Sequence, residues 1–237
     1  MGGNNWFQFK QFRIEQRRAA MKVGTDGVLL GAWTPIEDSH TILDVGTGTG
    51  LVALMLAQRS KSVIDALEID QLASDEARFN FKQSVWYDRL HCIQGDFNIF
   101  AKDSTTSYDL IVSNPPFFVN SLKTKDPSLS IARHSETLTF EQLITGAKLR
   151  LVPSGCLCVI IPLQSCPEFK ETSRISGFYL RKQTTVIPKI GKPAKRALLA
   201  FSLQKCYPIV DELIILDSNG LYTDQFKSLT ASFYPAF

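Results

Sequence analysis

The chain has 237 residues, of which 44% are hydrophobic and 21% are charged, and its net charge is +3. This is an ordinary globular balance, and the length fits one α/β domain with a full core. No apolar run is long enough to span a membrane, and no apolar signal segment follows the N-terminus. We therefore expect a cytoplasmic protein, whose mild positive charge is compatible with nucleic acid but does not by itself indicate it.

The cysteines argue against disulfide and metal chemistry. Their number is odd, and no two have the CxxC spacing of a zinc ligand pair. We expect reduced thiols and no metal site. The five are Cys92, Cys156, Cys158, Cys166 and Cys206.

The N-terminal stretch alternates aromatic and polar side chains. Phe7, Phe9 and Phe12 are interleaved with glutamine, lysine and arginine, which predicts an ordered basic and aromatic extension, for which a hairpin is one suitable form. A short apolar helix follows, which Thr25 or Asp26 is expected to cap and Pro35 to end.

Strands then alternate with helices along the rest of the chain. This order predicts an α/β fold of the Rossmann-like doubly wound type, with a mostly parallel sheet and helices on both faces. No repeat or linker interrupts it, so residues 1–237 are expected to form a single domain. The predicted strands are 41–45, 62–70, 90–94, 108–113, 156–162, 179–187, 197–203 and a short edge strand at 213–216; the predicted helices are 51–59, 71–82, 139–151 (stopped by Pro153-Ser154-Gly155), 166–175 and 224–233.

A glycine-rich turn follows the first of these strands. Asp44-Val45-Gly46-Thr47-Gly48-Thr49-Gly50 lets the backbone approach a ligand closely and opens a helix whose N–H groups are free. Counted from Gly48 through Gly50 to Ala53, it also matches the dinucleotide fingerprint, so spacing does not exclude NAD. Asp44 is the better discriminator, because a carboxylate there disfavours a pyrophosphate and suits a zwitterionic amino-acid moiety.

Two further acids end the next two strands. Glu68 is placed to bind ribose hydroxyls, and Asp96 to accept a hydrogen bond from an adenine amine. The structural alternatives are a solvated strand end for Glu68 and a cap for the segment after Gly95 for Asp96.

The stretch around Asn114 suits chemistry on an exocyclic amine. A short apolar strand runs into Asn114-Pro115-Pro116-Phe117, and the prolines end it in a stiff loop. The Asn114 side-chain oxygen and the Pro115 carbonyl can hold both hydrogens of a planar amino group, and Phe117 can stack on a flat ring. The alternative is a rigid turn with an aromatic plug.

Taken together, these motifs resemble the class I S-adenosylmethionine-dependent methyltransferases. Over nearly its full length the chain is more narrowly similar to the bacterial family that N6-methylates the adenine beside the anticodon of valine tRNA. The similarity includes Phe7 to Phe12, Met21 to Gly27, Asn114 to Phe118, Arg133-His134 and Lys192 to Arg196.

This resemblance implies a seven-stranded sheet whose last strand is antiparallel, and a segment from Lys22 to Asp26 that folds over the methionine end of S-adenosylmethionine. It assigns catalytic roles to Asn114, Pro115 and Phe117. It assigns cofactor-binding roles to Lys22, Gly24, Thr25, Asp26, Asp44, Gly46, Gly48, Gly50, Glu68, Asp96 and Asn114.

We expect tRNA as the substrate and partner, with no membrane and no obligate protein partner. Phosphates would lie along two basic groups, although such charge runs are often only solvated faces. Arg133 and His134 are weaker candidates for the cleft. Alternatives left open are methylation of rRNA guanine N2 or of a protein glutamine, a non-catalytic RNA-binding protein, and an NAD oxidoreductase. The basic groups are Lys10, Arg13, Arg17 and Arg18, and Lys189, Lys192, Lys195 and Arg196.

Overall fold

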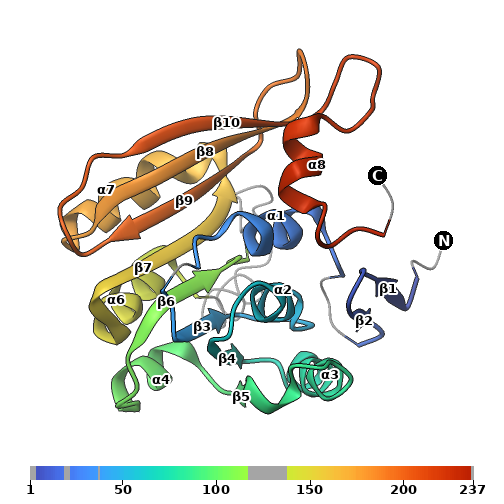
Figure 1. The fold of residues 1–237 in the computed structure, drawn as a ribbon. Helices are drawn as coiled ribbons and strands as arrows, with labels where there is room; N and C mark the ends of the chain where they lie inside the picture. Colours follow the sequence, from blue (N-terminus) through green and yellow to red (C-terminus); the bar gives the residue numbers. More distant parts are fainter. Residues whose placement is uncertain (1–3, 19–21, 37, 117–137, 236–237) are drawn as a thin grey trace, which may run out of the picture.

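The computed structural model describes residues 4–18, 22–36, 38–116 and 138–235. Its centre is an eight-stranded sheet with the order β10-β8-β9-β7-β6-β3-β4-β5 (Figure 1). A separate antiparallel hairpin, β1–β2, precedes it. The strands are β1 (Trp6–Gln8), β2 (Arg13–Glu15), β3 (Thr41–Val45), β4 (Val63–Glu68), β5 (Leu90–Gln94), β6 (Tyr108–Ser113), β7 (Leu151–Pro162), β8 (Tyr179–Lys189), β9 (Arg196–Ser202) and β10 (Ile209–Leu216).

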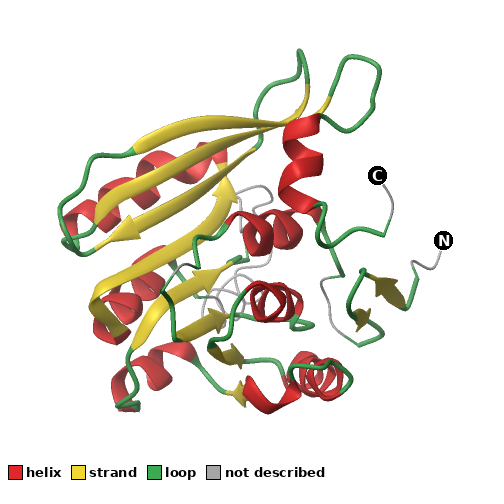
Figure 2. Ribbon diagram, in the orientation of Figure 1, coloured by secondary structure: helices red, strands yellow, loops and turns green. Residues whose placement is uncertain are grey.

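Helices cover both faces of the sheet, as Figure 2 shows. Side chains along each strand alternate between two buried clusters: Leu110 and Val112 enter the one that α1, α2 and α8 cover, and Ile111 enters the one that α4, α6 and α7 cover. This period of two is why the central strands are apolar throughout. The helices are α1 (Thr25–Trp33), α2 (Leu51–Arg59), α3 (Gln71–Lys82), α4 (Phe97–Asp103), α6 (Phe140–Arg150), α7 (Cys166–Ile175) and α8 (Asp224–Thr230).

The predicted fold class is confirmed, with one difference at the sheet edge. β9 runs antiparallel to both of its neighbours, β7 and β8, as the resemblance implies for the seventh strand. β10 then adds an eighth strand, parallel to β8, and it begins at Ile209, four residues before the predicted edge strand. The antiparallel strand is therefore not the last.

Several boundaries differ from the sequence prediction. Residues 153–155 were expected to stop a helix, but α6 ends at Arg150 and these residues lie inside β7 (Leu151–Pro162), between its register pairs Leu151–Tyr108 and Cys156–Leu110. Helix α4 was not predicted. α1 begins at Thr25 after an extended Gly24, so neither Thr25 nor Asp26 is its cap. The final helix ends at Thr230, three residues before the predicted end.

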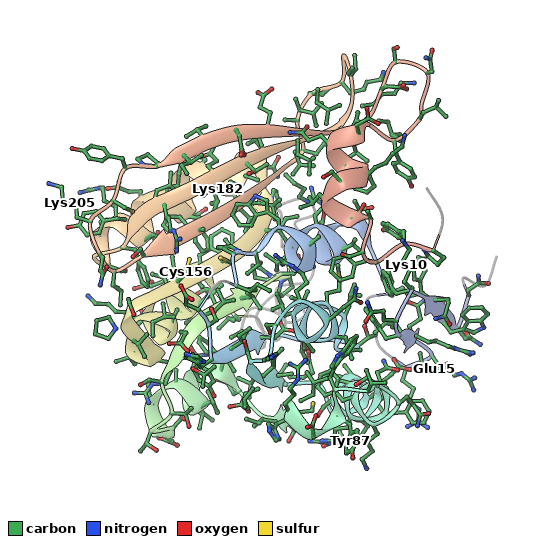
Figure 3. All side chains as sticks on the ribbon, in the orientation of Figure 1. Lys10, Glu15, Tyr87, Cys156, Lys182 and Lys205 are labelled. Atoms are coloured by element: carbon green, nitrogen blue, oxygen red, sulfur yellow. The ribbon has the colours of Figure 1, made fainter. Side chains whose placement is uncertain are left out.

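The predicted N-terminal hairpin is confirmed, and it packs against the C-terminal segment. The rings of Phe9 and Tyr234 lie with centroids 5.9 Å apart, and the Lys10 backbone N–H donates to the Phe233 carbonyl at 2.7 Å. Figure 3 shows Lys10 and Glu15 on this side of the molecule, with Glu15 beside α3. Within the described residues, no helix is long and apolar enough to cross a membrane.

Candidate active site

The carboxyl ends of β3 and β6 bring the glycine-rich turn beside Asn114. Val45 and Ser113 are register partners on these parallel strands, so Gly46 and Asn114 are each one residue past a paired position. Neighbouring strands are about 4.8 Å apart, so the two residues are adjacent across the sheet. The Ser113 hydroxyl donates to the Val45 carbonyl at 2.9 Å and fastens the two strand ends together.

Open space lies in front of two of the three glycines in the turn. Gly46 and Gly48 have φ angles of 72° and 58°, and a Cβ built on either would meet nothing within 4 Å. Gly50 also has a positive φ, but there a Cβ would lie 2.4 Å from the Phe81 ring. Gly46 and Gly48 therefore face a space that a ligand can enter, whereas Gly50 allows α2 to pack on α3.

Asp44 is buried beneath the turn and holds its backbone in place. Its Oδ2 accepts from the Thr47 hydroxyl at 2.6 Å and from the Ala53 N–H at 3.2 Å. Burial raises the pKa of this carboxyl to about 7, and the two hydrogen bonds oppose that shift only in part. Asp44 therefore lies behind the glycine-rich turn and stabilises its backbone, and it is not exposed on the open side of the turn.

Glu68 at the end of β4 also contacts the turn. Its Oε2 accepts from the Gly48 N–H at 2.8 Å, and its Oε1 accepts from the Asp70 N–H at 3.0 Å. The side chain is buried, so the solvated strand end considered from the sequence is wrong. The carboxylate lies against the glycine-rich turn, on the next strand from Asp44.

Asp96 follows β5 and caps α4, which was the structural alternative considered for it. Its Oδ1 accepts from the Asn98 and Ile99 N–H groups at 2.6 and 3.3 Å. Both bonds use the same oxygen, so the cap does not by itself exclude a ligand at Oδ2. The Gly95 N–H donates to the Glu68 carbonyl at 2.9 Å, which keeps the ends of β4 and β5 together.

Asn114 carries a buried acceptor atom that lacks a donor. Its Oδ1 is fully covered, yet it accepts no hydrogen bond from any residue that the structure describes. An unsatisfied buried acceptor costs about 1–3 kcal/mol and needs an explanation, which a donor on a bound substrate would provide here. Pro115 beside it is buried and Pro116 is exposed. Phe117, Arg133 and His134 lie outside the described residues.

The predicted segment Lys22 to Asp26 leads into α1 beside the same edge. A Cβ on Gly27 would lie 3.0 Å from Leu51, the first residue of α2, so the start of α1 lies close to the end of the glycine-rich turn. Asp26 forms a 2.7 Å ion pair with Arg196, at the start of β9. Gly24, Thr25 and Lys22 are exposed. The segment therefore lies between the turn and the β8–β9 connection.

Sequence reasoning missed the residues that support this edge. Thr47, Ser113 and Asn80 position the acids, the strand ends and the turn through hydrogen bonds. Thr47 and Ser113 lie inside motifs that were singled out for other residues. Asn80 is 30 residues from the turn in sequence, and no local signal marks it.

Comparisons with known proteins agree with this architecture. A profile described as the methyltransferase small domain matches residues 23–168. The chain belongs to this methyltransferase family. It is 45% identical over 97% of both chains to a protein of Bacteroides fragilis named tRNA1(Val) (adenine(37)-N6)-methyltransferase. A protein of the same name from Flavobacterium psychrophilum is 46% identical over 96% of this chain and 98% of its own.

Solved structures support the fold of this methyltransferase. A predicted O-methyltransferase from Agrobacterium tumefaciens superposes with a TM-score of 0.71 at 20% identity, covering 88% of this chain and 96% of the other. At that identity the likeness concerns the fold alone. The architecture expected from the sequence is therefore confirmed by a second, independent comparison.

Proposed function

We propose that this methyltransferase transfers a methyl group from S-adenosylmethionine to N6 of an adenine in tRNA, at the anticodon-adjacent position 37 of a valine tRNA. The observation that carries the reaction type is the orphaned, buried Asn114 Oδ1 beside the glycine-rich turn. Near full-length identity of 41–46% to curated enzymes of that activity supports the choice of substrate.

The residues at the sheet edge fit the cofactor. Open space at Gly46 and Gly48 admits a ligand close to the backbone, directly before the N-terminus of α2 at Leu51. Glu68 and Asp96 follow on successive strands, so a ligand lying along the edge would meet the turn, then Glu68, then Asp96. When bound, S-adenosylmethionine supplies a sulfonium methyl group as the electrophile.

Asn114 and Pro115 would prepare the nucleophile. The adenine amine is weakly nucleophilic because its lone pair is delocalised into the ring. The Asn114 Oδ1 and the Pro115 carbonyl each accept one of its hydrogens, which favours a more tetrahedral nitrogen and stabilises the positive charge that develops there. Catalysis then comes from orientation and electrostatics, without a nucleophilic residue. Phe117 is proposed to stack on the base, which must be turned out of its loop to enter.

The two basic groups lie on either side of this edge. Arg196 pairs with Pro162, the last residue of β7, so residues 190–195 project past the carboxyl edge of the parallel strands. On the other side the hairpin contacts the turn through Asn80. Lys10 is the weakest phosphate candidate, because its Nζ already donates to the Ala231 carbonyl. Since tRNA is cytoplasmic, we place the enzyme there too.

Incubation of the purified protein with total tRNA and labelled S-adenosylmethionine tests the proposal. Nucleoside analysis should give N6-methyladenosine, and the label should be found at position 37 of a valine tRNA. N2-methylguanosine, or label in protein alone, would instead support the alternatives that share the Asn-Pro-Pro-Phe chemistry. No transfer together with NAD-dependent thermal stabilisation would overturn the reaction type.

A further inference from the structure

The β1–β2 hairpin makes buried hydrogen bonds to two segments of the candidate cofactor site. The first connection runs through Asn80 on α3, which is 2% exposed. Its Oδ1 accepts from the Glu15 N–H at 2.9 Å, and its Nδ2 donates to the carbonyls of Glu15 and Thr49, both at 2.9 Å. One amide group thus joins the hairpin to the glycine-rich turn.

The second connection runs through Gln16, which directly follows the hairpin and is 5% exposed. Its Oε1 accepts from the Val23 N–H at 2.7 Å, and its Nε2 donates to the Asn4 carbonyl at 2.8 Å. Val23 lies immediately before Gly24, the extended residue that precedes α1. Gln16 therefore holds the segment that borders the turn from the opposite side.

A third bond set fixes the hairpin itself in place. The buried carboxylate of Glu76 on α3 accepts from the backbone N–H groups of Arg17 and Arg18, at 2.6 and 3.1 Å. Buried, fully paired polar groups of this kind define one geometry, because any shift leaves a donor or acceptor unsatisfied. The hairpin is consequently locked to the turn and to the start of α1 together.

We propose that Gln16 and Asn80 are positioning residues for the cofactor, and that the hairpin is part of the framework of the cofactor site rather than only a surface for RNA. The inference rests on the proposed function. Neither side chain is expected to contact the cofactor. Gln16 orients the backbone before Gly24, and Asn80 orients the carbonyl of Thr49 between the open glycines and α2.

The test compares four variants for binding of S-adenosylhomocysteine by calorimetry and for KM and kcat. Gln16→Leu removes the acceptor for the Val23 N–H together with the donor to Asn4. Asn80→Asp keeps an acceptor for the Glu15 N–H but loses the donor to the carbonyls of Glu15 and Thr49. Each should raise the Kd of S-adenosylhomocysteine and the KM of S-adenosylmethionine about three- to tenfold, the equivalent of one net hydrogen bond. The kcat at saturating substrates should change less than twofold or so.

Two matched variants distinguish a specific effect on the cofactor site from a general loss of stability. Gln16→Glu keeps an acceptor for Val23 and should recover most of the affinity. Gln58→Leu makes the same type of change outside the site, at a glutamine whose Nε2 donates to the Ser232 carbonyl at 2.7 Å and whose buried Oε1 accepts from no described residue. It should leave the Kd unchanged, whatever it does to the melting temperature. Unchanged Kd values in folded Gln16→Leu and Asn80→Asp, or an equal shift in Gln58→Leu, would overturn the inference.

Hydrogen exchange of the unmodified protein gives a second measurement that does not depend on variant folding. S-adenosylhomocysteine should slow exchange in a peptide covering residues 4–18 as well as at the turn. Protection of the turn with no change in the hairpin would refute the positioning role while leaving the proposed function intact. Failure of the unmodified protein to bind S-adenosylhomocysteine would remove the proposed function, and the inference with it.

Discussion

At the scale of single residues, the reaction type depends on the buried Asn114 Oδ1, which accepts from no described residue. We predict that Asn114→Ala lowers kcat by about 10²–10³-fold, the usual cost of losing one group that stabilises developing charge. The Kd of S-adenosylhomocysteine should change little, because the orphaned Oδ1 is assigned to the substrate amine. Single-turnover methylation of tRNA and calorimetry measure the two effects, and unchanged turnover would refute the role.

Two glycines of the turn, Gly46 and Gly50, should respond differently to the same substitution. Alanine at Gly46 or Gly50 is strained by a positive φ, at a cost of about 1–2 kcal/mol. Gly50→Ala adds a clash with Phe81, so its melting temperature should fall further. Gly46→Ala should weaken S-adenosylhomocysteine binding more, because its Cβ would enter open space. Thermal denaturation and titration of both variants check this, and equal effects on binding would contradict it.

Asp44 should give the fold a pH dependence of unusual sign. Its pKa is about 7 in the folded protein against 3.8 as the reference value, so the folded state holds a proton that the unfolded state releases. This group's contribution to stability therefore falls as the pH rises from about 4 to 7. The melting temperature of the unmodified protein, relative to Asp44→Asn, should decrease over that range. A difference independent of pH would show that Asp44 is ionised throughout.

At the scale of elements, the helices and strands that could be predicted are those marked by residues within or next to them in the sequence. α3 (Gln71–Lys82) and β5 (Leu90–Gln94) have the expected boundaries, and the Asp70 side chain caps α3. α4 was missed although Asp96 caps it and Phe97, Phe100 and Ala101 form an apolar face, since Asp96 was interpreted mainly as a ligand. β7 includes Pro153 because residues 152–155 bulge out between the register pairs Tyr108–Leu151 and Leu110–Cys156, a tertiary feature with no local signature.

The β8–β9 connection carries the next prediction. It projects past the carboxyl edge, and Lys192 and Lys195 are exposed there. Replacing both with alanine should weaken tRNA binding and reduce the slope of log K against log salt by about 1.8, if each neutralises one phosphate. Lys205→Ala, at the opposite end of β9, is the matched control. Equal salt slopes for the double variant and the unmodified protein would assign these lysines to a solvated face.

At the scale of the whole molecule, the order of the motifs along the carboxyl edge of the sheet could be predicted from the sequence. The hydrogen bonds that hold these motifs in place could not. Strand alternation alone brings Gly46, Glu68, Asp96 and Asn114 to one edge. The bonds that fix them join positions far apart in the chain, such as Asn80 to Glu15 and Ser113 to Val45. Hydrophobic periodicity does not indicate such pairs. The sequence therefore predicts which residues lie together at the edge, but not the hydrogen bonds that position them.

The same long-range bonds bear on whether the chain unfolds as one unit, as a single domain should. Trp86 lies near the hairpin, its ring centroid 6.0 Å from that of Phe12, whereas the Trp33 Nε1–H donates to Thr184 on β8 at 2.7 Å. Two variants would each retain one of these tryptophans, Trp33 or Trp86, with phenylalanine at the other two tryptophan positions. The thermal transition followed by tryptophan fluorescence should be the same in both variants and should match the transition followed by circular dichroism at 222 nm. The reason is that the hairpin is bonded to α3, to the turn and to the C-terminal segment, so it cannot separate without breaking the core around the sheet. An earlier transition at Trp86 alone would mean that the hairpin side is a separate folding unit.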